Sequence, residues 1–447
     1  MLRRATLALA GLLFLGGTVR SIAVAEVQAP PASPMLKEYR PCWVLCPMEN
    51  RYPAADFALP DSADCPPSLF PRMAMLAVEW EEWSARAPEA GNLGRKPSRV
   101  GRCVPRALAA FRVESGGRIV RRYDLPEKRP QPLIAALSTA DAIFSHTGTI
   151  RCAQPDWWYR IQPVVGRVDS IGHHAWLFPS PQGLSYVTLH DWGGEDALVD
   201  DSGESHPLGL CVEDVHFTPD SVVVIGYSAD CDKGGRSPVI GPLCLHVFSR
   251  KGALGSTIRI GLTGSIQHRA FRPDGAVAAV VTAHEPGTAD QRNLVVVFTD
   301  GTIVRRALEG GCLPLSFRDS LLCIDDGRDL RVLSARSLGE RSRFVAPWEA
   351  LGCSKLGTIG AVLLPGERVV LQGMNGRARD LGPDDVNLAI GMFDFAGKPL
   401  GWFVDLPGSS EPSRFQELYH PSLELFEPGW LLVSIENLGL ALYDVRE

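Results

Sequence analysis

The 447-residue sequence lacks the short motifs that define the common metal and catalytic sites. It has no D-x-D-x-D-G calcium loop and no H-E-x-x-H zinc-protease helix. Residues 168–172 approach the G-x-S-x-G nucleophile elbow, but the first glycine is missing and no helix-forming sequence follows. The S-x-D-x-G-x-x-W box of sialidases is also missing. The sequence therefore indicates no specific reaction.

The N-terminal apolar run, residues 5–19, is shorter than the roughly 20 residues that a membrane-spanning helix needs, and Arg20 ends it. Two arginines precede the run and small residues follow it up to Ala25, which is the pattern of a secretory signal peptide. We predict a cleaved signal peptide over residues 1–25. The mature protein is then periplasmic or secreted, with no stable membrane span; an uncleaved anchor is the less favoured alternative.

The cysteines also lack the paired spacing that is typical of zinc sites. The 11 cysteines include no C-x-x-C pair, so in an oxidising compartment we expect disulfides rather than zinc. Cys312 with Cys323, and Cys231 with Cys244, are close enough in sequence to close local loops. The odd number leaves one thiol unpaired.

Only one segment has a helical pattern. Residues 26–105 form a Pro- and Cys-rich extension in which residues 26–67 have little periodicity. Apolar residues then recur every three or four positions from Leu69 to Trp83, which predicts one helix at about residues 69–86.

The rest of the chain, residues 106–447, has a repeated pattern of turns and β-branched runs. Phe271 to Gly275 reads F-R-P-D-G, a turn that precedes a buried strand, and a Thr-Asp-Gly turn ending at Gly301 joins two further runs. Similar turns recur about every 49 residues, the length of one four-stranded propeller blade. We predict an all-β fold, a β-propeller. Seven blades are favoured and six or eight are left open, with the hairpin at residues 107–124 pairing with the terminal strand to close the ring.

These turns resemble the F-S-P-D-G blades of tryptophan-aspartate repeat proteins and of Tol-system periplasmic propellers, most clearly at Phe217 to Ser221 and at Phe271 to Gly275. The resemblance covers about 300 residues and implies a blade architecture. The Gly-His and Trp-Asp dipeptides are missing from regular blade positions, so no activity follows from it.

Basic residues are missing from a long window. Between Arg167 and Lys233 there is no Lys or Arg, whereas 12 acidic residues and five of the ten histidines lie there. Loss of the three arginines of residues 1–25 changes the formal net charge from −6 to −9, which argues against nucleic-acid binding.

Carboxylates suit hard cations and imidazoles suit zinc or copper, so one interpretation of this window is a divalent-metal site. Its candidate ligands are His173, His174, His190, Asp191 and His216. The favoured interpretation is a solvated acidic rim without a cofactor.

Three adjacent aromatic residues, Trp157, Trp158 and Tyr159, are the candidates for ligand binding, because such side chains stack on sugars or peptides. We predict a non-catalytic secreted or periplasmic propeller that binds a protein or a cell-envelope ligand. The alternatives are a metal-assisted hydrolase or lyase on the acidic, histidine-rich blades, and a structural envelope scaffold.

Overall fold

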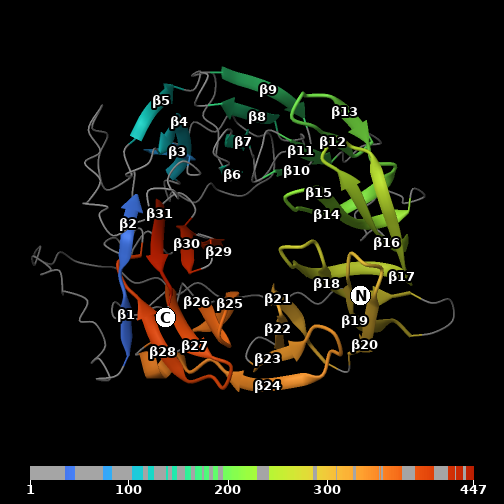
Figure 1. Ribbon diagram of the computed structural model, residues 1–447. Helices are drawn as coiled ribbons and strands as arrows, with labels where there is room; N and C mark the ends of the chain where they lie inside the picture. Colours follow the sequence, from blue (N-terminus) through green and yellow to red (C-terminus); the bar gives the residue numbers. More distant parts are fainter. Residues whose placement is uncertain are drawn as a thin grey trace, which may run out of the picture.

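The computed structural model consists of short antiparallel sheets arranged around a ring (Figure 1). It describes residues 36–45, 74–82, 103–113, 119–124, 137–138, 143–147, 157–162, 167–173, 176–180, 185–189, 195–228, 241–284, 289–308, 310–325, 329–351, 353, 356–374, 388–406, 421–427, 429–435 and 439–446.

Seven sheets form this ring, and the seven-stranded one contains two four-stranded units that share strand β17. We call the resulting eight units blades 1 to 8 in chain order. Blades 1 to 4 comprise β3 to β5 (Ala74–Glu82, Cys103–Val113, Ile119–Asp124), β6 to β9 (Leu137–Ser138, Ile143–Thr147, Trp157–Gln162, Arg167–His173), β10 to β13 (Trp176–Pro179, Tyr186–Leu189, Ala197–Val199, Ser205–Pro207) and β14 to β17 (Leu210–Phe217, Ser221–Ser228, Gly241–Ser249, Leu254–Phe271).

Blades 5 to 8 complete the ring. They comprise β17 with β18 to β20 (Val277–Ala283, Gln291–Val297, Ile303–Ala307), β21 to β24 (Leu313–Phe317, Ser320–Asp325, Asp329–Ser334, Glu340–Val345), β25 to β28 (Gly357–Leu364, Arg368–Met374, Leu388–Asp394, Pro399–Phe403) and β29 to β31 (Pro421–Glu427, Trp430–Ile435, Gly439–Asp444). The β-propeller prediction is confirmed. Within the described residues the blade number is eight, one of the numbers left open, in place of the favoured seven.

Strand β17 shows how one blade leads to the next. Its first half pairs with β16 at the outer edge of blade 4, and its second half, from Gly264, pairs with β18 at the inner edge of blade 5. The first strand of each blade lies towards the ring axis and the last towards the outside (Figure 1).

The N-terminal strands close the ring. Strand β2 (Pro41–Leu45) pairs antiparallel with β31 and becomes the outermost strand of blade 8, and β1 (Lys37–Tyr39) pairs parallel with β28 of blade 7. The prediction that the hairpin at residues 107–124 pairs with the terminal strand is therefore wrong. The hairpin itself is present as β4 and β5, but its partner is β3. Two strands also lie in residues 26–67, where we expected little regular structure.

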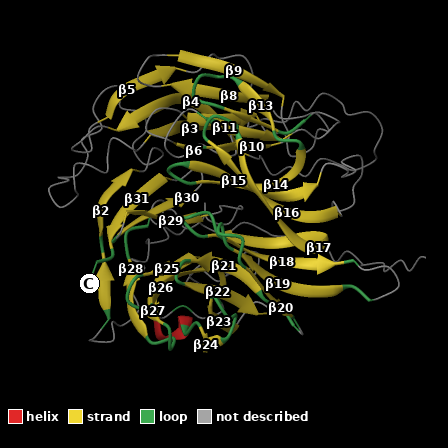
Figure 2. Cartoon of the chain, turned by 45° about the vertical axis from the view of Figure 1, so that its right-hand side comes forward, coloured by secondary structure: helices red, strands yellow, loops and turns green. Residues whose placement is uncertain are grey.

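Within residues 74–82, the described part of the helix predicted at about residues 69–86, the structure has strand β3. The same residues also alternate, with Leu76, Val78 and Trp80 at every second position, and pairing with β4 selects this period. Within the described residues the only helical element is a short 3-10 turn, Trp348–Leu351 (Figure 2), and none is long and apolar enough to cross a membrane. The predicted extension boundary at residue 105 lies inside β4.

The central strand β15 of blade 4 packs both faces against neighbouring blades. In β15, Val223 and Ile225 belong to the core shared with blade 5, whereas Val222 and Val224 belong to the core shared with blade 3. All four side chains have no exposed surface. Because successive side chains of a strand point to opposite faces, a continuous apolar run is what a strand between two blades requires.

The turn predicted at Phe271 to Gly275 is present between the two innermost strands of blade 5, β17 and β18. Gly275 has φ +90°, and a Cβ at this position would lie 2.5 Å from Cγ2 of Val223. Its amide donates to the Arg272 carbonyl at 2.9 Å. Both the backbone conformation and the available space therefore require glycine.

Both predicted local disulfides are wrong, since Cys244, Cys312 and Cys323 are free thiols. The thiols of Cys312 and Cys323 hydrogen-bond to one another without a covalent bond, and Cys244 contacts His246 instead. Cys42 and Cys211 are each disulfide-bonded.

Candidate functional site

The innermost strands of five consecutive blades, blades 4 to 8, each contain a β-bulge in which one residue has no cross-strand partner. In blade 8 this residue is Phe426, one position before the end of β29. In blades 4 to 7 the unpaired residues lie further from the end of the strand. These residues are Glu213 in β14, Gln267 in β17, Leu315 in β21 and Ile359 in β25. A bulge redirects side chains and interrupts pairing, and bulges are frequent beside functional sites. The recurrence defines a candidate site, which we call the inner bulge surface.

The inner bulge surface changes from polar to apolar around the ring. The two polar positions are Glu213 of blade 4, which is partly buried, and Gln267 of blade 5, which is exposed. Ile359 of blade 7 has 42% of its surface exposed although it is a large apolar residue. The four positions together offer hydrogen-bonding groups on one side and apolar contact on the other.

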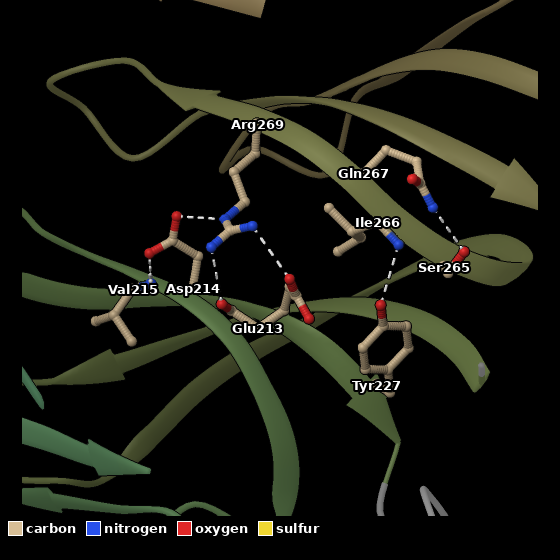
Figure 3. Close-up of polar contacts among 8 residues, drawn as sticks. All are labelled: Glu213, Asp214, Val215, Tyr227, Ser265, Ile266, Gln267 and Arg269. Carbon is tan, nitrogen blue, oxygen red and sulfur yellow. Dashed lines mark hydrogen bonds and ion pairs between the residues drawn. The ribbon is translucent and has the colours of Figure 1, made fainter. Parts of the chain in front are cut away.

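Arg269 joins the two polar bulges (Figure 3). Its Nε donates to Oδ2 of Asp214 at 2.5 Å, its Nη1 donates to Oε1 of Glu213 at 3.1 Å, and its Nη2 donates to the Glu213 carbonyl at 3.2 Å. The other carboxylate oxygen of Asp214 accepts from the Val215 amide at 2.8 Å. One guanidinium therefore fixes the innermost strands of two blades relative to each other.

Burial raises the pKa of Glu213, and Arg269 opposes this effect. On the neighbouring strand, the fully buried Tyr227 accepts a hydrogen bond from the Ile266 amide at 3.0 Å (Figure 3). Burial raises the pKa of Tyr227 to about 12, so the phenol stays protonated near neutral pH. The bulge at Gln267 is thus held by a hydrogen bond on one side and an ion pair on the other.

Two histidines lie on the same strands. Burial lowers the pKa of His268, and Arg292 and Arg269 lower it further. Burial also lowers the pKa of His216, whose ring stacks on Phe271 and hydrogen-bonds to the Pro273 carbonyl. Neither histidine therefore adds a stable positive charge to this region at neutral pH.

A further acid lies on the innermost strand of blade 8. Glu424 of β29 has an exposed surface, yet burial by the surrounding protein raises the pKa of its carboxyl. The two facts agree if the side chain contacts solvent in surroundings otherwise filled by protein, as the inner side of a ring provides. No described residue forms a hydrogen bond or ion pair with Glu424.

Of the candidate metal ligands predicted from the sequence, the structure describes only His173 and His216. His216 lies in β14, and its Nε2 is buried without a hydrogen-bond partner among the described residues. His173 ends β9 on the outer edge of blade 2, where its side chain is outside the described part. His174, His190 and Asp191 lie outside the described residues. The metal prediction thus stays a prediction.

The aromatic candidates lie together in β8, the third strand of blade 2. Trp157 is the backbone partner of His173, Trp158 of Gly172, and Tyr159 of Ser170. Their side chains are outside the described part, so the predicted ligand contact stays a prediction.

Sequence reasoning missed one group of possible metal ligands at the turn between β12 and β13. Ligand atoms of Asp200, Glu204 and His206 lie within 4.8 Å of one another, the only such group in the part of the chain that the structure describes. Oδ1 of Asp200 accepts from the amide and hydroxyl of Ser202 and from the Glu204 amide, and Oδ2 lies 3.1 Å from Nε2 of His206. The Ser202 and His206 contacts hold the pKa of Asp200 well below its usual range. These bonds already fix the turn.

No protein-family model and no curated protein matches the sequence. Solved structures similar to this chain include YCF48 bound to D1 peptide, at 10% identity and TM-score 0.40, over 69% of this chain and 90% of that one. Virginiamycin B lyase from Staphylococcus aureus has 8% identity and TM-score 0.38, over 70% and 94%. KlHsv2 with loop 6CD replaced by a Gly-Ser linker has 13% identity and TM-score 0.39, over 65% and 88%.

The chain is a β-propeller protein, as its ring of antiparallel blades shows. The low identities and TM-scores of the similar structures add no inference about its function.

Proposed function

We propose that the protein is a binding propeller, exported by the predicted signal peptide to the periplasm or out of the cell, and that it binds a protein ligand on the inner bulge surface. The observation that carries the proposal is the recurrence of a bulge in four consecutive innermost strands. Single exposed apolar residues are common on any protein surface, so Ile359 alone would mean little. A bulge in the innermost strand of four consecutive blades is a repeated structural feature.

The surface suits binding because its two sides supply different contributions. Apolar contact at the exposed Ile359 supplies affinity when water is displaced, whereas Leu315 is partly buried against the core of its own blade. The side chains of Glu213 and Gln267 supply hydrogen bonds that orient a partner. Arg269 holds the two polar bulges in place before binding, which lowers the entropy cost of association.

The test is capture from the cell-envelope fraction by the immobilised mature protein, compared with two variants. Ile359→Asp places a charge on the inner bulge surface. Val345→Asp is the matched control, because Val345 is an equally apolar side chain, 57% exposed, on the outermost strand β24. We expect Ile359→Asp to lose the captured protein by about tenfold or more, equivalent to about 1.4 kcal/mol, and Val345→Asp to retain it.

Equal capture by all three proteins, with melting temperatures unchanged, would count against the inner bulge surface as the binding site. Capture of nothing by the wild-type protein at low and moderate salt would favour the scaffold alternative.

One observation favours a metal-assisted hydrolase or lyase as a second candidate. A ring nitrogen of His216 hydrogen-bonds to a backbone carbonyl while Nε2 has no partner among the described residues, an arrangement that metal-binding histidines share. Further ligands would have to come from outside the described part, because His216 forms no close group of ligands with other described residues. Metal analysis of the purified protein and of His216→Ala tests this. Stoichiometric metal that is lost in the variant would support the enzyme, and a metal-free wild-type protein after reconstitution would overturn it.

A further inference from the structure

The innermost and outermost strands of the ring carry opposite charge. The innermost strands, counting residues 264–271 of β17, hold seven acidic residues and one arginine, a formal charge of −6. The acidic residues are Glu79, Glu81, Glu82, Glu213, Asp214, Glu424 and Glu427, and the arginine is Arg269. Among the acids, the structure describes the side chains of Glu213, Asp214 and Glu424.

The outermost strands, counting residues 254–260 of β17, hold nine basic and four acidic residues, a formal charge of +5. The basic residues are Lys37, Arg121, Arg122, Arg167, Arg259, Arg305, Arg306, Arg341 and Arg343, and the acidic ones are Glu38, Asp124, Asp169 and Glu340. Charged edge strands prevent edge-to-edge association, which explains the outer arginines. Protection of outer edges does not explain why the innermost strands carry an excess of acidic residues.

Two of the inner carboxylates still have capacity for a cation. Arg269 contacts one oxygen of Glu213 and leaves the other free. Glu424 is exposed and has no cation or hydrogen-bond donor among the described residues, and nearby protein raises the pKa of its carboxyl, which reflects a desolvation cost of the charged form. A positively charged group near the axis would relieve this cost.

We infer that the ligand of the inner bulge surface is an extended basic peptide segment, an inference that rests on the proposed binding function. Basic side chains would pair with Glu424 and Glu213, and an apolar side chain between them would cover Ile359. The innermost strands are also sheet edges, whose backbone groups can pair with an extended chain. A metal ion fits less well, because Glu213 and Glu424 lie on different blades and form no close group of ligands with other described residues.

The probes are two fluorescently labelled peptides of equal length, one alternating Lys and Leu and the other alternating Glu and Leu. Anisotropy titrations use the full mature protein at low and at moderate salt. We expect the basic peptide to bind at least about tenfold more tightly than the acidic one, and salt to reduce the difference.

Variants locate the effect. Glu424→Gln should weaken the basic peptide about fivefold, equivalent to about 1 kcal/mol, and it removes no contact that holds the fold. Glu340→Gln on the outermost strand β24 is the matched control and should change nothing. Glu213→Gln should weaken binding similarly, with a melting curve to check that Arg269 still holds the blades.

The inference would be overturned if the two peptides bound with equal affinity, or if neither bound up to about 1 mM. Equal effects of Glu424→Gln and Glu340→Gln on binding of the basic peptide would also overturn it. The proposed function fails separately. If Ile359→Asp abolishes capture from the envelope while the basic and acidic peptides bind with equal affinity, the inner bulge surface binds a ligand that is not a basic peptide.

Discussion

The inner and outer ends of the same blades are built differently. In blade 5, the outer hairpin between β19 and β20 is closed by Gly301, beside which nothing lies within 4 Å, whereas the inner turn at Gly275 is packed against Val223 of blade 4. In this blade the innermost strand carries a bulge at Gln267, and the outermost strand β20 is mostly exposed and holds two arginines. The outer ends therefore tolerate change, and the inner ends combine close packing with the candidate site.

The largest expected difference concerns these two glycines. Gly275→Ala should cost about 3 kcal/mol of unfolding free energy, because positive φ costs about 1–2 kcal/mol and overpacking about 1–3 kcal/mol. Gly301→Ala has the same φ of +90° but free space, and should cost only about 1 kcal/mol. Urea unfolding of both variants measures the difference, and equal losses would show that the inner turn is no more closely packed than the outer one.

Arginine pairs give the next comparison. Arg269→Met leaves Glu213 and Asp214, both partly buried, without a cation and should cost about 2 kcal/mol. Arg446→Met removes an equally short ion pair with Asp444, in which both side chains are about half exposed, and a contact of the guanidinium with the Trp430 ring, and it should cost less than about 1 kcal/mol. If Arg269→Met is as harmless as Arg446→Met, the guanidinium does not hold blades 4 and 5 together.

The smallest expected effect is a pH dependence. Burial raises the pKa of Glu424 in the folded protein above its unfolded value of about 4.3, so the folded state binds more protons and stability falls as pH rises between the two values. Glu424→Gln should therefore stabilise the protein above this window, by less than about 1 kcal/mol because the carboxyl also contacts solvent, and should be neutral below it. Chemical denaturation at pH 4 and pH 8 tests this. A variant that is less stable than wild type at pH 8 would mean that Glu424 has a cationic partner.

The sequence predicted what depends on local chemistry. The positive φ of Gly275 and Gly301 follows from turns that need glycine, and regular turn spacing was enough to indicate a propeller. Ring closure was missed because pairing of β2 with β31 joins residues about 400 positions apart, and nothing local in residues 41–45 specifies it. The segment at residues 69–86 has both helical and alternating periods, so only its pairing with β4 decides between them.

The candidate site was harder to predict for a similar reason. A bulge is one unpaired residue in a register, and the residues at these positions, Glu213, Gln267, Leu315 and Ile359, share no chemical type that a repeat search would detect. The partnership of Arg269 with Glu213 and Asp214 depends on β17 crossing from one blade to the next. The predicted aromatic and histidine candidates were chosen by residue type, and the structure describes only the side chain of His216 among them.

Site-specific photo-crosslinking tests the central claim most directly. A photoreactive amino acid replaces Ile359 in one variant and Val345 in another, and both are irradiated in intact cells that produce the full chain. The inner bulge surface predicts a discrete protein adduct from position 359 and none from position 345. An adduct from position 345 alone, or adducts of equal yield from both positions, would contradict it.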